Sequence, residues 1–122
     1  MIALEVLVGC RVSRLTLDHQ VVLLLVDDAS EGRRVSATLI LEEAFELTLG
    51  PQTHLVDPDD PTTLGPTCRL LHQTISAASA ADGGTLDLLV GDAIALRLTP
   101  TGNYEAWELF GTGVPSVLIG PA

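Results

Sequence analysis

Cys68 and His72 form the pair of residues whose spacing comes nearest to a metal site. Four positions apart on a helix, a thiolate and an imidazole would share one face, where both could bind zinc. A structural zinc site needs more ligands, and the remaining thiol and imidazoles, on Cys10, His19 and His54, have no partner spacing around them. We therefore expect no metal, a buried thiol at Cys68 and a surface imidazole at His72.

The sequence also argues against a catalytic nucleophile. Cys10 lies beside Arg11, which favours a thiolate, but no other group of a cysteine hydrolase converges on it. The Gly-x-Ser-x-Gly motif is absent, and the Gly-Thr-Gly step at residues 111–113 is too short for a dinucleotide-binding loop. The chain contains no lysine, which excludes Schiff-base chemistry and a Gly-Lys-Ser/Thr phosphate loop. We expect no enzymatic activity and no cofactor.

Two pairs of carboxylates have the spacing of opposite strand faces. Glu43 and Glu46 are three positions apart, as are Glu105 and Glu108. Side chains three apart on a strand point to opposite faces, whereas catalytic carboxylates converge on one site, so these four are expected to be solvated. Alternatively, Glu43 or Glu105 would form a structural salt bridge with a buried arginine such as Arg14 or Arg97.

Period-two alternation of apolar and polar residues predicts that most of the chain forms strands. Residues 21–26 are apolar without alternation, so we expect both faces of that strand to be covered. Short turns separate most of the strands, which favours antiparallel pairing. The expected strands are residues 12–18, 21–26, 35–41, 45–49, 75–80, 86–90, 94–98, 104–110 and 117–119.

The connector at residues 51–73 differs in character from the rest of the chain. It contains two Asp-Pro steps, at Asp57 and Asp60, which are typical of a helix N-cap followed by proline in the first helical position. We expect one short helix over about residues 63–72. Asp57, Asp59 and Asp60 lack the glycine-centred loop that calcium prefers, so helix capping explains them better.

One five-residue sequence occurs twice in the chain. Internal similarity at a nearly constant spacing is typical of a duplicated supersecondary unit. We therefore predict two copies of one unit, over about residues 7–50 and 70–111. The matching segments are residues 43–47 and 105–109, which read Glu-Ala-aromatic-Glu-Leu, and residues 24–26 and 88–90, which read Leu-Leu-Val.

Length and pattern together predict the fold class. A chain of 122 residues is sufficient for a single domain, residues 1–122, with a core of its own. We predict an α+β fold that is mostly antiparallel β. Two duplicated hairpin or meander units would form a small sandwich or a partly open barrel, with one short helix between them.

The chain is strongly acidic, with a formal net charge of −10 from 16 acidic residues and six arginines. A phosphate backbone would repel such a chain, so no nucleic-acid binding is expected. The charge suits solubility or a basic protein partner. The longest aliphatic run, residues 21–26, is far shorter than a membrane span, and no signal peptide or disulfide framework is recognisable. We expect a cytoplasmic protein that does not bind membranes.

The sequence Tyr-Glu-Ala-Trp-Glu-Leu at residues 104–109, together with the acidic Val-Asp-Pro segment that begins at residue 56, resembles a family of uncharacterised small proteins from high-GC bacteria. The resemblance extends over residues 8–109. It implies no catalytic residue. Because some of these relatives look like neighbours of toxin or secretion genes, it implies an immunity-type binding role.

The lack of catalytic chemistry leaves binding as the expected function. We predict an interaction module with a protein partner, and Tyr104, Trp107 and Glu105 are the candidate interaction residues; Trp107 and Tyr104 are also expected in the core and at its edge. Two alternatives stay open. One is a self-associating homodimer, because residues 21–26 and 86–90 are very apolar, and the other is a small-molecule binder or enzyme with a site near Trp107.

Overall fold

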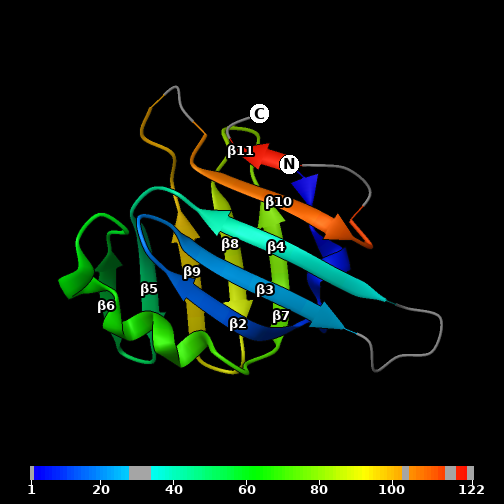
Figure 1. The fold of residues 1–122 in the computed structure, drawn as a ribbon, viewed down its shortest axis with the longest axis horizontal. Coiled ribbons are helices and arrows are strands. Elements are labelled where there is room, and N and C mark those ends of the chain that lie inside the picture. Colours follow the sequence, from blue (N-terminus) through cyan, green and yellow to red (C-terminus); the bar gives the residue numbers. More distant parts are fainter. Residues whose placement is uncertain (1, 28–33, 103–104, 115–117, 121–122) are drawn as a thin grey trace.

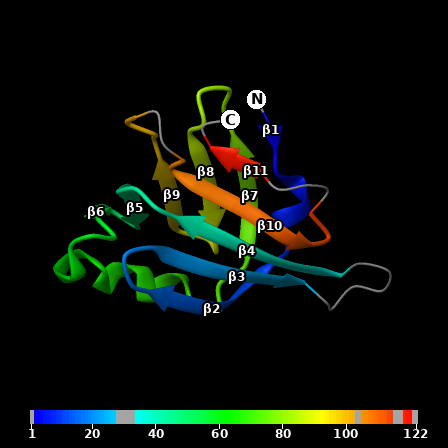
Figure 2. The same cartoon turned by 45° about the horizontal axis from the view of Figure 1, so that its top comes forward.

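The computed structural model describes residues 2–27, 34–102, 105–114 and 118–120. In this part of the chain eleven strands form two sheets, and the strands of one sheet cross in front of those of the other (Figures 1 and 2). The strands are β1 (Ile2–Ala3), β2 (Arg11–Leu17), β3 (Val21–Asp27), β4 (Val35–Leu41), β5 (Phe45–Leu49), β6 (Gln52–Val56), β7 (Ile75–Ala80), β8 (Leu86–Val90), β9 (Ile94–Leu98), β10 (Trp107–Thr112) and β11 (Leu118–Gly120). The short 3-10 helices are η1 (Glu5–Leu7), η2 (Pro61–Thr63) and η3 (Gly65–Leu70).

The two sheets differ in size but share antiparallel pairing throughout. The six-stranded sheet has the order β1-β7-β8-β9-β5-β6, and the five-stranded sheet has the order β11-β10-β4-β3-β2. Neither sheet closes on itself, so the fold is open and not a closed barrel. The prediction of a mostly antiparallel fold of two sheets is therefore confirmed. No helix among the described residues has the length and apolar composition needed to cross a membrane.

The two halves of the chain use the same strand pairing, and each places its fourth strand in the sheet of the other half. In the first half β2, β3 and β4 form a meander in the five-stranded sheet, while β5 pairs with β9 in the six-stranded sheet. In the second half β7, β8 and β9 form a meander in the six-stranded sheet, while β10 pairs with β4. This exchange brings both halves into one hydrophobic core.

Each half also has a β-bulge at the same place. Ser13 in β2 and Ser76 in β7 lie where the strand register shifts. The Ser13 hydroxyl donates to the Leu24 carbonyl at 3.4 Å, and the Ser76 hydroxyl donates to the Leu89 carbonyl at 3.2 Å. Leu24 therefore corresponds to Leu89, and the predicted match of Leu24 with Leu88 is displaced by one residue. The common ancestry of the halves stays a prediction.

The inward faces of both sheets form the core, and its largest side chain is Trp107, at the start of β10. Trp107 and Phe45, the first residues of the two exchanged strands, are each 1% exposed. The indole N–H of Trp107 donates to the carbonyl of Gly84 at 2.7 Å. Because Gly84 lies in the turn between β7 and β8, this bond joins the two sheets.

The predicted helix over residues 63–72 is present only as 3-10 turns. Pro66 has no N–H to donate and Gly65 has a high entropic cost in a helix, so a regular α-helix is disfavoured here. The Thr67 hydroxyl donates to the Leu64 carbonyl at 2.6 Å, which engages a backbone acceptor of the first turn. The predicted short helix is therefore present in the connector, as 3-10 turns and not as a regular α-helix.

The two predicted aspartate caps have different outcomes. Asp60 is the N-cap of η2, since its Oδ1 accepts the Thr62 N–H at 3.1 Å and Pro61 follows it in the first helical position. Asp57 caps no helix. Its Oδ1 accepts the N–H of Asp59 at 3.0 Å, which makes a local turn before η2.

Two expectations about the positions of strands need correction. Gly50, with φ +60°, and Pro51 turn the chain back on itself, so residues 52–56 form the edge strand β6 and do not belong to an irregular connector. The strand expected over 104–110 begins at Trp107, and Tyr104 lies outside the described residues.

Residues 21–26 were expected to be covered on both faces, and within the single chain only the inward face is fully covered. The inward side chains of β3 are fully buried, whereas those that point outward are only partly buried. The outward face of the five-stranded sheet is therefore apolar and partly open to solvent.

Candidate binding surface

The outward face of the six-stranded sheet carries a polar row of side chains that crosses five strands. Its residues are paired side by side across β7, β8, β9, β5 and β6. In β8 and β9 the residues before and after each member of the row are buried. Because side chains alternate along a strand, the row itself points away from the core. The row consists of Ser79, Asp87, Arg97, Glu46 and Leu55.

A second row lies beside the first, and its side chains are mostly shorter and carry no charge. It consists of Ala77, Leu89, Ala95, Thr48 and Thr53. Leu89 lies between two alanines, Ala77 and Ala95, in the neighbouring strands. Their side chains are short, so the Leu89 side chain protrudes from the middle of the sheet. It is 51% exposed, although β8 has a paired strand on each side. Leu55, on the edge strand β6, is 65% exposed.

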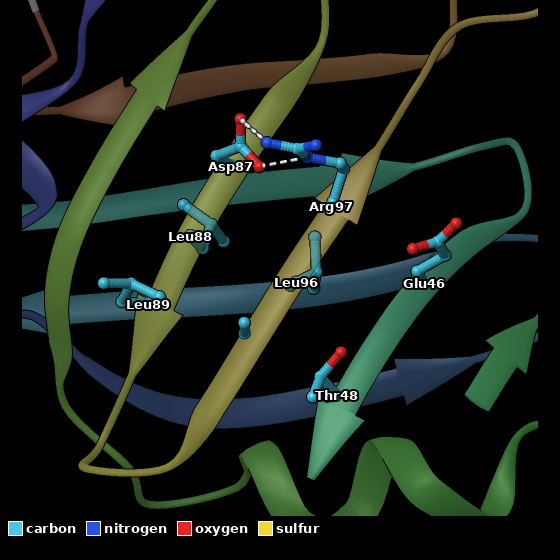
Figure 3. Close-up of a pocket in the computed structure, with 8 residues that line it drawn as sticks. Glu46, Thr48, Asp87, Leu88, Leu89, Leu96 and Arg97 are labelled. Atoms are coloured by element: carbon cyan, nitrogen blue, oxygen red, sulfur yellow. Dashed lines mark hydrogen bonds and ion pairs between the residues drawn. The ribbon is translucent and has the colours of Figure 1, made fainter. Parts of the chain in front are cut away.

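Leu89 and Ala95 separate two shallow hollows on this face. One hollow, of about 330 Å³, reaches from Leu89 to Arg97, Glu46 and Thr48 (Figure 3). The other, of about 260 Å³, reaches from Leu89 to the turn between β8 and β9 and includes Asp92. Both contain polar and apolar groups, which suits a side chain of a partner better than an enclosed small molecule.

The first hollow is bordered by an ion pair. Arg97 Nε donates to Asp87 Oδ1 at 2.7 Å, and its Nη2 donates to Oδ2 at 3.4 Å (Figure 3). Hydrogen bonding and charge from Asp87, with a smaller contribution from the charge of Glu46, raise the pKa of Arg97. The guanidinium is turned toward Asp87, so the Glu46 carboxylate on the other side remains available to a cation (Figure 3).

The residues predicted for interaction do not meet on this face. Trp107 is buried in the core, where its N–H is already bonded, and it lines neither hollow. Glu105 is exposed just before β10, on the other sheet. Tyr104 lies outside the described residues.

The candidate metal pair is also separated. Cys68 is exposed and not buried as expected, and His72 lies beyond the end of η3 with a positive φ of 71°. The two residues therefore do not share a helix face. The described part of the chain contains no group of three or more potential metal ligands.

Among the residues that the structure describes, the expected salt bridge of Glu43 or Glu105 to a buried arginine is not formed. Arg97 and Arg14 are both exposed, and Arg97 pairs with Asp87. Glu43 instead accepts the Thr101 hydroxyl at 2.6 Å, which anchors the loop after β9.

Sequence analysis did not single out Leu89 as a surface residue. Leu86, Leu88 and Val90 occupy one face of β8 and are buried. A leucine between them, at position 89, must point to the opposite face, and this was the signal in the sequence for an exposed leucine. That signal was used only to suggest self-association. Leu55 gave no signal, because β6 was not expected.

Fold and surface together define an open, two-sheet antiparallel β protein with a partly apolar, acidic sheet face. The model of a family of unknown function, DUF6188, matches residues 3–122, and the chain belongs to this family. The resemblance to an uncharacterised family is confirmed at this level. A search of curated proteins and a search of solved structures each found no match.

Proposed function

We propose that this protein is a non-enzymatic interaction module that binds a protein partner through the outward face of the six-stranded sheet. The observation that carries the proposal is Leu89, a large apolar side chain that is 51% exposed on an interior strand. Contiguous exposed apolar surface on a soluble protein often marks a binding site. Leu89 and the neighbouring alanines, Ala77 and Ala95, supply such surface at the centre of the sheet, and Leu55 adds a separate apolar side chain at its edge.

The charges around Leu89 favour a basic partner. Carboxylates of Glu46, Asp87 and Asp92 line the two hollows, against the single guanidinium of Arg97. Arg97 is paired with Asp87, which leaves Glu46 and Asp92 to attract cationic groups. The net charge of −10 would speed the approach of a basic partner. An immunity-like role, in which an acidic protein covers a basic one, is the form of this proposal that the family resemblance implies.

A ligand site beside Trp107 has less support. The indole is 1% exposed and its N–H is bonded to Gly84, so a ligand would have to displace core packing to reach it.

The test is capture from native cell lysate by the immobilised protein, compared with two variants. Leu89→Asp places a charge at the centre of the proposed surface. Leu17→Asp makes the same change at a leucine that is 38% exposed on an edge strand of the other sheet. The wild type and Leu17→Asp should retain the same basic protein, which raised salt should elute, and Leu89→Asp should lose it.

Equal recovery by Leu89→Asp and the wild type would overturn the proposal. So would a retained protein that is acidic, or chemical cross-links that map only to the five-stranded sheet. Circular dichroism of each variant shows whether the fold is intact before capture is compared.

A further inference from the structure

The outward face of the five-stranded sheet is apolar at its centre. Val22, Leu24 and Val26 of β3, Ile40 of β4 and Phe110 of β10 are all partly buried, and all point outward. They occupy neighbouring positions, since Val22 is the Cα partner of Ile40. This gives the five-stranded sheet an apolar surface distinct from the one around Leu89.

Opposite charges lie on the two sides of this apolar centre. Arg14 is exposed on the edge strand β2, and Glu108 is partly exposed on β10. Within the described residues neither of these two side chains has an ion-pair partner. The six-stranded sheet is different in this respect, because Arg97 and Asp87 already satisfy each other there.

We infer that this face binds a second copy of the chain and forms a twofold homodimer. Two such faces can be packed against each other as in a β-sandwich. The twofold axis would lie between the two faces, parallel to the strands and midway between β3 and β4. The rotation places β2 of one copy over β10 of the other, and β3 over β4. Val22 of each copy then meets Ile40 of the other, which covers the apolar centre.

The charges support this arrangement over the other twofold packing. Arg14, Leu24, Thr38 and Phe110 form one cross-strand row, and Glu108 lies in the next row. After the rotation Arg14 faces Phe110 of the second copy and lies one row from its Glu108, so a cation–π contact and an ion pair each form twice.

An axis that runs across the strands would have a different result. It would stack β2 on β2 and bring the two Arg14 side chains together, while Glu108 would have no cation. Charge complementarity therefore selects the arrangement in which β2 lies over β10.

The size of the face predicts a weak dimer. Four strands of about six residues cover roughly 400 Å² in projection, which is small beside the roughly 800 Å² of surface that each partner buries in a typical stable interface. The net charge of −10 on each copy also opposes association. We therefore expect dimerisation at micromolar concentrations or above, and not at nanomolar ones.

The experiment is sedimentation equilibrium of the whole chain from about 10 µM to about 1 mM, with charge reversals at the two predicted contact residues. Arg14→Glu and Glu108→Arg should each weaken dimerisation by about 10-fold or more, because each creates like charges across the interface. The double variant Arg14→Glu/Glu108→Arg should restore the dissociation constant to within about 3-fold of the wild type.

Arg69→Glu is the matched control, because Arg69 is exposed on η3 and its reversal changes the net charge by the same amount as Arg14→Glu. Its dissociation constant should change by less than about 3-fold. A wild type that stays monomeric at about 1 mM would overturn the inference. It would also be overturned by equal effects of Arg14→Glu and Arg69→Glu, by a double variant that is not restored, or by dimerisation that Leu89→Asp abolishes.

Discussion

Gly9 and His72 occupy matching places in the two halves of the chain and join the halves through their backbones. Both have positive φ angles, 93° and 71°. The Gly9 N–H donates to the Ile75 carbonyl at 2.8 Å, and the His72 N–H donates to the Val12 carbonyl at 2.7 Å. In return, Ile75 and Val12 donate their own N–H groups, at 2.8 and 2.9 Å, to the carbonyls of the residues that follow Gly9 and His72. The left-handed backbone is thus needed at both positions, but only one of them is glycine.

Replacement of His72 by glycine should stabilise the protein. A residue with a β-carbon is strained at φ 71°, whereas glycine adopts this conformation freely. We expect His72→Gly to raise the free energy of unfolding by about 0.5–1 kcal/mol, measured by urea denaturation followed by circular dichroism.

His72→Ala is the matched control for this prediction, because it removes the imidazole but keeps the β-carbon and its strain. It should give no comparable gain. Gly9→Ala should lower stability by about 1 kcal/mol, because it introduces at φ 93° the strain that His72 already has. A gain that is the same in His72→Ala and His72→Gly would contradict the explanation.

Trp107→Phe should lower stability by about 2–4 kcal/mol, because it leaves a cavity in the core and a buried Gly84 carbonyl without its donor. The measurement is chemical denaturation by circular dichroism, since Trp107 is the only tryptophan and its fluorescence is lost in the variant. Phe45→Leu, at the corresponding position of the other sheet, removes core volume but no hydrogen bond. It should therefore cost less, and an equal or larger cost would argue against a role for the indole bond.

Gly120→Ala should destabilise the same region. A β-carbon at Gly120 would collide with the Trp107 indole at and around its nitrogen, so the ring would have to move away from Gly84. We expect a loss of about 1–3 kcal/mol, with a lower thermal midpoint. Gly83→Ala is the control, because a β-carbon there would meet no atom within 4 Å. If both variants have the same thermal midpoint as the wild type, the packing at Gly120 is looser than the structure indicates.

Regular alternation made most of the strands predictable. In β4, for example, apolar residues recur at every second position from Val35 to Leu41, and the predicted and observed bounds agree. The edge strand β6 was missed because its outward Leu55 and inward His54 reverse the usual pattern. The predicted helix formed only as 3-10 turns because local proline and glycine outweighed the spacing of leucines after Leu64.

The binding surface was less predictable than the fold. Trp107 was predicted to take part in interaction because it is a large aromatic residue. Such a residue is as suitable for a core as for a binding surface, and only the packing of the folded chain determines that Trp107 is in the core. Pairing between Arg97 and Asp87 depends on the register of β8 against β9, which the sequence does not specify without the turn geometry. Strand exchange between the halves likewise depends on long-range packing that the repeat alone could not reveal.

The ion pair at the proposed binding surface should make a contribution to stability that is constant around neutral pH. Asp87, and to a smaller extent Glu46, raise the pKa of Arg97 in the folded state. A raised pKa means that the folded protein holds this proton more tightly, so the contribution is complete below the pKa of the unfolded chain and disappears only as the pH rises through the folded value. The difference in thermal midpoint between the wild type and Arg97→Gln should therefore be the same from about pH 6 to about pH 9.

Arg97→Lys is the informative comparison, because lysine begins to lose its proton near pH 10. Above that pH the thermal midpoint of Arg97→Lys should fall further below that of the wild type. A difference between the wild type and Arg97→Gln that changes between about pH 6 and about pH 9 would show that another titrating group controls this face.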